Sequence, residues 1–283
     1  MHVKSDGLVC PLDGRPLSSA QGRLHCDNGH SYDLAKQGYC HLLPVQQKRS
    51  ADPGDSKAMV QARRELLDSG AYRPLVAELL QMVTNQSTGA LRIADAGCGE
   101  GYYLNQIKLL IDSQQGAADT AQLIGYDISK WAVQAATKRS KAIRWLVASS
   151  KNIPIANDYL DVMFCMFGFP VWSEFARVLA PGGKVILVDA GPQHLIELRT
   201  ILYDEIKPHK EWQSASAEQA GFEQSTCKRL PPYQVELNKQ QIETLALMTP
   251  HFFRAPAANK IKLAALAQLD VTIDVEFREL TLR

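Results

Sequence analysis

The most informative segment of the sequence is Ile93-Ala-Asp-Ala-Gly-Cys-Gly-Glu-Gly-Tyr102. Apolar and small residues lead into Gly97, Gly99 and Gly101, which occupy alternate positions, and an amphipathic helical pattern follows over 103–110. This is the pattern of a strand, a tight turn and a helix start, in which the backbone can approach a ligand closely. The spacing differs from that of dinucleotide and Walker phosphate loops, so it does not predict a pyrophosphate or triphosphate site.

The pattern Asp-x-Gly-Cys-Gly-x-Gly, which begins at Asp95, resembles motif I of the S-adenosylmethionine-dependent methyltransferases. An ordinary tight turn between a strand and a helix is the alternative for so short a match. A second strand, predicted over 122–127, ends at Asp127. In this topology an acidic side chain at that point accepts hydrogen bonds from two ribose hydroxyls. A helix cap at Asp127, before the helix predicted over 130–139, is an alternative compatible with that role.

Strands and helices continue to alternate beyond this point. We predict strands over 143–148, 160–167 and 184–189, with a helix over 172–179 and a Pro-Gly-Gly turn before the last strand. Further elements follow: helices over 192–206 and 239–248, and strands over 234–237 and 271–277. The two late strands fit the antiparallel edge hairpin of class I methyltransferases. The predicted fold class is therefore α/β, a Rossmann-like class I methyltransferase with a doubly wound parallel sheet.

Composition sets the outer limits. With 283 residues and 46% hydrophobic content, the chain can bury a full domain core and has length for a second, smaller domain. No apolar run reaches transmembrane length, and the first residues do not resemble a signal peptide. Six cysteines without a disulfide framework suit a reducing compartment, so we expect a cytoplasmic protein without a membrane partner. A net charge of +1 means that any RNA-binding surface must be a local patch.

The N-terminus carries two short knuckles, one from Cys10 to Asp13 and one from Cys26 to His30. Such turns present two ligands each to one tetrahedral zinc ion. Asp13 stands where a second cysteine would complete the first knuckle, and a carboxylate is a harder ligand than a thiolate. A metal-free hairpin held by packing is the alternative. Two other residues could serve as ligands but have less suitable spacing, His25 and Cys40. We expect zinc at Cys10, Asp13, Cys26 and His30.

Several further motifs occur in one order along the chain. They are Asp33-Leu-Ala-Lys-Gln-Gly-Tyr39, Leu42-Leu-Pro-Val-Gln-Gln-Lys-Arg-Ser50, Asp52-Pro-Gly-Asp-Ser56, a Gln-Ala-Arg-Arg run over 61–75, Gly191-Pro-Gln-His194 and Met248-Thr-Pro250. Together with the knuckles and the glycine turn, they closely resemble the ribosomal RNA large-subunit guanine-N1 methyltransferase A family over essentially the whole chain. The linker motifs make this resemblance far more specific than the glycine turn alone.

The resemblance implies an activity and a set of contacts. Members of this family transfer a methyl group from S-adenosylmethionine to N1 of a guanine in a hairpin loop of 23S rRNA, and they are homodimers. The resemblance implies cofactor contacts at Tyr72, Gly99, Glu100 and His194. With the residues of the glycine turn and the end of the second strand, the expected cofactor-binding residues are Tyr72, Asp95, Gly97, Gly99, Glu100, Gly101, Asp127 and His194. Without the family, Tyr72 would pass as a core aromatic and His194 as a surface residue at a helix start. The implied organisation is a zinc-ribbon-like RNA-recognition domain over 1–45, a linker and helix over 46–75, and the methyltransferase domain over 76–283.

Within the family, subgroups modify neighbouring guanines of one hairpin, at rRNA positions 745 and 748. This chain is more similar to the position-745 subgroup. Two other functions stay open from the residues alone. One is a methyltransferase acting on a small molecule, and the other is a zinc-ribbon RNA-binding protein whose methyltransferase core has lost activity.

Guanine N1 carries a proton that must be lost, so a general base near the transferred methyl group would assist. We hypothesise that Asp55, which follows Asp52-Pro-Gly in a loop, accepts it; turn formation is the alternative role for both aspartates. For RNA contact we expect basic residues around the knuckles and linker: Lys36, Lys48, Arg49, Arg63 and Arg64. Four aromatic residues could stack a flipped base, and at least two of them are expected to serve packing instead: Phe164, Phe167, Phe169 and Trp172.

Overall fold

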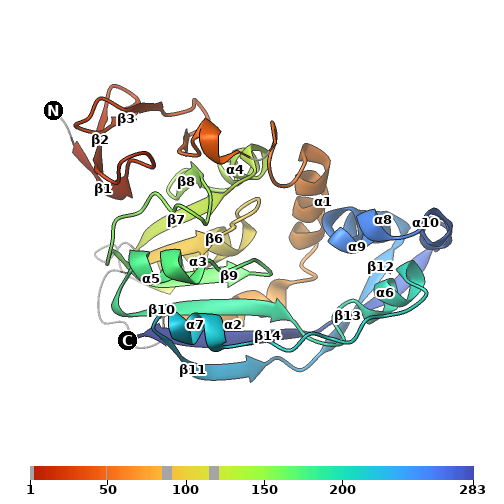
Figure 1. Ribbon diagram of the computed structural model, residues 1–283. Coiled ribbons are helices and arrows are strands. Elements are labelled where there is room, and N and C mark those ends of the chain that lie inside the picture. Colours follow the sequence, from red (N-terminus) through yellow and green to blue (C-terminus); the bar gives the residue numbers. More distant parts are fainter. Residues whose placement is uncertain (1–2, 49, 85–90, 115–120) are drawn as a thin grey trace.

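A computed structural model describes residues 3–48, 50–84, 91–114 and 121–283 (Figure 1). Arg49, one of the expected RNA contacts, lies outside the described residues. The strands are β1 (Val3–Val9), β2 (Pro16–Ala20), β3 (Arg23–His25), β4 (Ser31–Asp33), β5 (Tyr39–His41), β6 (Arg92–Ala96), β7 (Gln122–Asp127), β8 (Arg144–Val147), β9 (Leu160–Met166), β10 (Leu179–Ala190), β11 (Phe222–Arg229), β12 (Tyr233–Asn238), β13 (Gln268–Ile273) and β14 (Val275–Leu282). The helices are η1 (Val45–Gln47), α1 (Lys57–Asp68), α2 (Arg73–Thr84), α3 (Tyr102–Gln114), α4 (Lys130–Ala136), α5 (Trp172–Val178), α6 (Ile196–Leu202), α7 (Ala215–Gln219), α8 (Lys239–Met248), α9 (Pro250–Arg254) and α10 (Ala257–Ala264).

The centre of the molecule is a sheet in the order β11-β14-β10-β9-β6-β7-β8-β5. Its strands from β10 to β5 pair in parallel, while β14 and β11 add an antiparallel edge. Successive residues of β6 face opposite sides, so that Ile93 joins the core under α2 and α3 and Ala94 joins the core under α5. Both faces are covered, as the apolar parallel strands require. The predicted α/β class I methyltransferase fold is confirmed.

The prediction that the strands over 234–237 and 271–277 form the edge hairpin of the large sheet is wrong. The strand predicted over 234–237 belongs to β12, which pairs with β13 in a separate two-stranded sheet. The run predicted over 271–277 is divided at Asp274 between β13 and β14. The true partner of β14 at the edge is β11, in which Phe222 alone is buried. An exposed strand without apolar alternation carries no periodic signal.

The helix predicted over 192–206 is shorter than expected. Helix α6 begins at Ile196, because Leu195 before it adopts a left-handed backbone with φ of 52°. The preceding residues form a turn in which the N–H of His194 donates to the carbonyl of Gly191 over 3.1 Å. This turn leaves His194 at the end of β10 rather than inside a helix.

The N-terminal strands β1 to β4 form a small antiparallel sheet, drawn in red in Figure 1. This sheet is fastened to the loop after β8, because the N–H of Val9 donates to the carbonyl of Pro154 over 3.1 Å and the Asn152 amide donates to the carbonyl of Pro11 over 2.8 Å. The chain then enters the large sheet as β5, in parallel with β8. The N-terminal sheet therefore lies at the edge of the large sheet that is formed by β7, β8 and β5.

A C-terminal lobe of β12, β13, α6, α8, α9 and α10 stands beside α1 at the right of Figure 1. Helix α8 packs on α1, so the segment between β5 and β6 meets the segment between β12 and β13. This lobe and α1 lie at the carboxyl ends of the parallel strands, where open α/β sheets bind their ligands. Among the described residues, no helix has the length and apolar character to cross a membrane.

Candidate functional site

A pocket of about 670 Å³ opens at the carboxyl ends of the parallel strands. Its walls come from the glycine turn after β6, the ends of β7, β8, β9 and β10, helix α1, and the segment that joins α8 to α9. Seven of the eight predicted cofactor residues line it: Tyr72, Asp95, Gly97, Gly99, Glu100, Asp127 and His194. The structure thus brings together residues from four separate parts of the chain.

Gly101, the eighth residue, does not line the pocket. Its φ is +83°, and a Cβ built on it would lie 2.7 Å from the Trp145 ring and 2.8 Å from the Cβ of Ala136. Both distances are below any normal carbon contact. Gly101 therefore allows the start of α3 to pack on β8 and α4, and it shapes the pocket from behind.

The glycine turn is tied to the end of β7. The N–H of Gly99 donates to Oδ2 of Asp127 over 3.0 Å, and the N–H of Ser129 donates to Oδ1 over 2.7 Å. Ser129 is the cap of α4, since its hydroxyl accepts from the N–H of Ala132. Asp127 therefore does not cap that helix. Each carboxylate oxygen can accept more than one hydrogen bond, so Asp127 retains the capacity to accept two ribose hydroxyls.

Asp95 is the least satisfied polar group of the pocket. Its side chain is 1% exposed, and neither carboxylate oxygen has a hydrogen-bond partner among the described residues. Burial, with the nearby carboxylates of Asp127 and Glu100, raises the pKa of Asp95 well above its ordinary value. An unpartnered buried carboxylate is costly unless a ligand brings hydrogen-bond donors or positive charge. S-adenosylmethionine carries a sulfonium and an ammonium group, so the pocket fits this cofactor.

Glu100 is also 1% exposed, but it is paired. Its carboxylate accepts from the guanidinium of Arg139, which also reaches Asp68 of α1 over 2.8 Å. Burial raises the pKa of Glu100, and the pairing with Arg139 opposes that rise. This network links the glycine turn to α1 and to the residues that follow α4, so it fixes one wall of the pocket.

Three aromatic rings that line the pocket contact one another. Phe167 stacks on His194 with a centroid distance of 5.5 Å and an interplanar angle of 24°, and Tyr72 meets both rings edge-on at 6.2 Å. Phe167 holds a left-handed backbone with φ of 52°, which is rare for a bulky residue and typical of functional sites. Burial lowers the pKa of His194 to about 4. His194 is therefore neutral near pH 7.

The expected base-stacking aromatics divide into two pairs. Phe164 is fully buried in the sheet, and Trp172 packs on Phe222 at 5.2 Å, so these two serve the core. Phe167 and Phe169 line the pocket. Phe169 is 90% exposed, so a ring stands at the mouth with its surface in solvent.

Asp55 and Arg63 both line the pocket and form an ion pair. The loop that carries Asp55 is docked on the turn after β7, because the Ser129 hydroxyl donates to the carbonyl of Asp55 over 2.7 Å. Asp52 points elsewhere and accepts from the indole N–H of Trp131 over 2.8 Å. Asp55, but not Asp52, lines the pocket. Arg63, which is expected on the RNA surface, lies in the pocket instead, and no local pattern marks it as a pocket residue.

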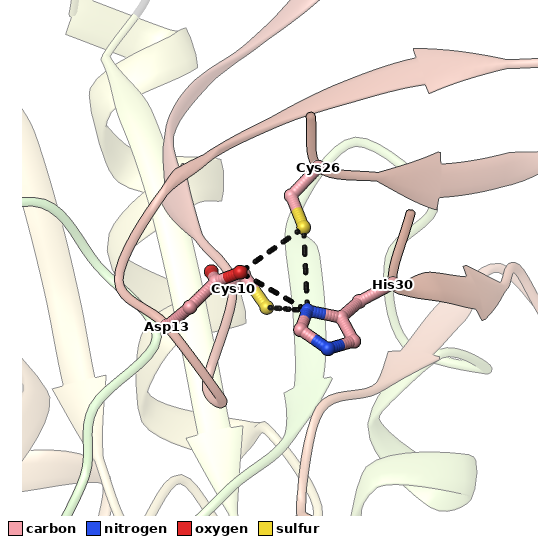
Figure 2. A group of neighbouring side chains, drawn as sticks. All are labelled: Cys10, Asp13, Cys26 and His30. Carbon is pink, nitrogen blue, oxygen red and sulfur yellow. Dashed lines mark hydrogen bonds and ion pairs between the residues drawn. The ribbon is translucent and has the colours of Figure 1, made fainter. Parts of the chain in front are cut away.

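The four predicted metal ligands converge in the N-terminal sheet (Figure 2). Their ligand atoms all lie within 4.8 Å of one another. Nδ1 of His30 is 3.4 Å from Sγ of Cys10, 3.4 Å from Sγ of Cys26 and 3.1 Å from Oδ2 of Asp13. Tetrahedral zinc, with bonds of about 2.3 Å to sulfur and about 2.0–2.2 Å to nitrogen and oxygen, separates such atoms by about 3.3–3.6 Å. The cluster fits zinc, and His25 and Cys40 lie outside it.

Hydrogen bonds from neighbouring groups hold Asp13, the carboxylate that stands where zinc ribbons usually have a cysteine. Oδ2 of Asp13 accepts from the Asn28 amide over 2.9 Å, and Oδ1 accepts from the N–H of Arg15 over 3.1 Å. The hydroxyl of Tyr32 lies 3.1 Å from Sγ of Cys10. Such outer contacts orient ligands and tune the affinity of a metal site. Asp13 is therefore positioned as a ligand and is not a free surface carboxylate.

Comparison with known proteins places both parts of the chain. A family model described as "RlmA, N-terminal", a zinc ribbon, matches residues 8–51, and one described as "Methyltransferase domain" matches residues 94–187. A 23S rRNA (guanine(748)-N(1))-methyltransferase of Streptomyces fradiae is 32% identical over 228 residues, which cover 79% of this chain and 78% of that protein. YxjB of Bacillus subtilis, provisionally named a 23S rRNA (guanine-N(1)-)-methyltransferase, is 31% identical and covers 94% of each chain. Among solved structures, the YcgJ protein of Bacillus subtilis has a TM-score of 0.49 at 13% identity, over 74% of this chain and 97% of that one.

Proposed function

The chain belongs to the family of the 23S rRNA (guanine-N1)-methyltransferases, and on that premise we propose that it transfers a methyl group from S-adenosylmethionine to N1 of a guanine in a hairpin loop of 23S rRNA. The observation that carries the proposal is the pocket around Asp95, a buried carboxylate without a partner among the described residues. A donor with a sulfonium and an ammonium group suits it. The metal cluster lies in the segment that matches the zinc ribbon described as "RlmA, N-terminal", and relatives aligned over most of this chain are named for 23S rRNA, which supports an RNA substrate.

The donor, when bound, supplies an electrophilic methyl group on a good leaving group. The protein then has mainly to orient donor and acceptor, with the reacting atoms about 3–3.5 Å apart. We assign the ribose to Asp127 and the positive charge of the donor to Asp95. Glu100, Gly97, Gly99 and Tyr72 complete the wall on which the donor lies.

Guanine N1 must lose its proton as it attacks. We assign this step to Asp55, which lines the pocket from the loop before α1 and is paired with Arg63 beside the glycine turn. One of its oxygens is held by Arg63, and Oδ1 has no hydrogen-bond partner in the parts of the chain that the structure describes. The held oxygen fixes the carboxylate, and the other is positioned to accept a proton. Turn formation alone would not require Asp55 to face the pocket.

The exposed ring of Phe169 is suited to stack the target guanine. A base taken out of an RNA loop is recognised by stacking on aromatic side chains. Phe169 is offered at the pocket mouth, and Gly168 before it has no room for a side chain, since a Cβ there would lie 2.5 Å from Sγ of Cys165. The turn is thereby fixed, with Phe167 against His194 and Tyr72 and with Phe169 exposed to solvent.

The target position and the assembly are part of the same proposal. We keep position 745 as the predicted guanine, although the Streptomyces fradiae relative is named for position 748. We assign RNA recognition to the zinc-ribbon-like domain over 1–45, with a linker and helix over 46–75 and the methyltransferase domain over 76–283. A cytoplasmic homodimer completes the proposal, and sedimentation equilibrium tests the dimer.

The reaction is tested by incubating the purified protein with isotopically labelled S-adenosylmethionine and unmodified 23S rRNA. The RNA is then digested to nucleosides, which are separated by mass. We expect label in 1-methylguanosine. Label in a methylated adenosine or cytidine, or none in RNA despite cofactor binding, would contradict the proposal.

A further inference from the structure

Arg63 connects three walls of the pocket. Its guanidinium pairs with Asp55 of the loop before α1, and Nη2 donates to the carbonyl of Met248 at the end of α8 over 3.4 Å. A Cβ built on Gly99 would lie 3.7 Å from Nη1, so the guanidinium stands directly over the glycine turn. The side chain is 26% exposed, and it is held from two sides. An arginine fixed in this way is a recognition group rather than a mobile surface charge.

The charges of the pocket are strongly unequal. Four lining residues are acidic, Asp55, Asp95, Glu100 and Asp127, whereas the basic lining residues are Arg63 and Lys151. Lys151 is exposed and lies in the loop after β8, whereas Arg63 is held over the glycine turn. If a ligand carries an anionic group beside its cationic groups, the anionic group needs a positively charged protein side chain close to the glycine turn. That side chain is Arg63.

We propose that Arg63 binds the α-carboxylate at the methionyl end of S-adenosylmethionine. This role rests on the proposed function in one respect, namely that the pocket binds S-adenosylmethionine. Guanidinium N–H groups form a planar fork that matches a carboxylate. Arg63 has five N–H groups, and the contacts with Asp55 and Met248 use two of them. The remaining donors are sufficient for a ligand carboxylate. Arg63 is then shared between the cofactor and Asp55, so that cofactor binding positions the proposed base.

The test uses two ligands that differ only in the carboxylate. They are S-adenosylhomocysteine and its decarboxylated analogue, S-adenosyl-3-thiopropylamine, with binding measured by calorimetry. For the unmodified protein we expect the analogue to bind about 10- to 100-fold more weakly, the range of a charged hydrogen-bond pair. Arg63→Gln should weaken the binding of S-adenosylhomocysteine by a similar factor and leave the affinity for the analogue unchanged. Arg63→Lys should lie between the two.

Arg64→Gln is the matched control. Arg64 is the next residue of α1, has a similar exposed fraction of 29%, pairs with Asp68 at 3.6 Å and does not line the pocket. It should leave both affinities unchanged. Asp55→Asn removes the competing partner of Arg63 and should not weaken S-adenosylhomocysteine.

Two results would overturn the assignment of Arg63. One is an Arg63→Gln variant that binds S-adenosylhomocysteine as tightly as the unmodified protein. The other is equal weakening of both ligands, which means that Arg63 holds the pocket together without touching the carboxylate. Failure of the unmodified protein to bind S-adenosylhomocysteine at all would instead overturn the proposed function itself.

Discussion

The backbone N–H of Asp274 donates a hydrogen bond to Nδ1 of His194 over 3.3 Å, and it thereby fixes the tautomer of the ring. With Nδ1 as the acceptor, the proton of the neutral imidazole resides on Nε2. The Asp274 side chain is itself held, since its carboxylate accepts from Nε of Arg229 over 2.7 Å and from the N–H of Gln193 over 2.9 Å. Asp274, which separates β13 from β14, therefore holds His194 in the pocket wall as a neutral ring that can donate from Nε2.

His194 predicts a specific pH dependence. Burial lowers its pKa from 6.5 in the unfolded chain to about 4, so the folded protein binds fewer protons than the unfolded chain between these values. Its contribution to the free energy of unfolding is complete above pH 6.5 and is lost as the pH falls toward 4. Side-chain ¹⁵N spectra should show a neutral ring from pH 8 down to pH 5.5. A titration with a midpoint near 6.5 would show that the ring is not held in this way.

Asp55→Asn tests the proposed base. The amide keeps the shape of the side chain but cannot accept the N1 proton as a carboxylate does, so turnover on 23S rRNA should fall by about 10²- to 10⁴-fold. Affinity for S-adenosylhomocysteine should not decrease. Asp52→Asn is the control, because Asp52 bonds Trp131 outside the pocket, and it should turn over normally. Near-normal turnover of Asp55→Asn would remove the assignment.

Phe169 tests the placement of the guanine. Because the side chain is 90% exposed, Phe169→Ala should leave thermal stability within the small range of ordinary surface substitutions. Loss of base stacking is worth about 1–3 kcal/mol, so kcat/KM on rRNA should fall by about 5- to 150-fold. Phe169→Tyr should retain most activity. Equal kcat/KM for the alanine variant and the unmodified protein would place the guanine elsewhere.

Asp13 predicts the behaviour of the metal site. Asp13→Cys adds a third thiolate, the softer ligand that zinc sites of this kind use, and should tighten zinc binding. Asp13→Ala removes a ligand and should weaken it by more than about tenfold, the loss produced even by an outer contact. Competition with a chromophoric chelator measures both. Wild-type zinc affinity in Asp13→Ala would mean that Asp13 is not a ligand.

Much of the fold could be predicted because its strands are apolar and its turns are marked. The segment over 91–96 and the glycines after it define β6 and the turn, and the predicted strand over 122–127 coincides with β7. The metal cluster was likewise predictable from two knuckles, since ligand spacing within a tight turn is local. These are features in which neighbours in sequence determine the geometry.

The rest depends on contacts between distant segments. Strand β11 has a single buried side chain, so only its pairing with β14 makes it a strand. Arg63 enters the pocket because α1 packs on α8, about 185 residues further along the chain. Gly101 was expected to contact the cofactor, and the ring of Trp145, far away in sequence, occupies the space behind it instead. No local pattern contains this information.

Primer extension through the 23S rRNA hairpin detects methylation of guanine N1 directly. A methyl group on guanine N1 blocks the Watson–Crick edge, so reverse transcriptase stops one nucleotide before the modified base. After incubation of unmodified rRNA with the protein and S-adenosylmethionine, we predict one new stop, next to position 745, that is absent without the cofactor. A stop at position 748 alone would keep the reaction and change its target. No cofactor-dependent stop in the hairpin, with cofactor binding intact, would contradict the claim that this chain methylates N1 of a guanine there.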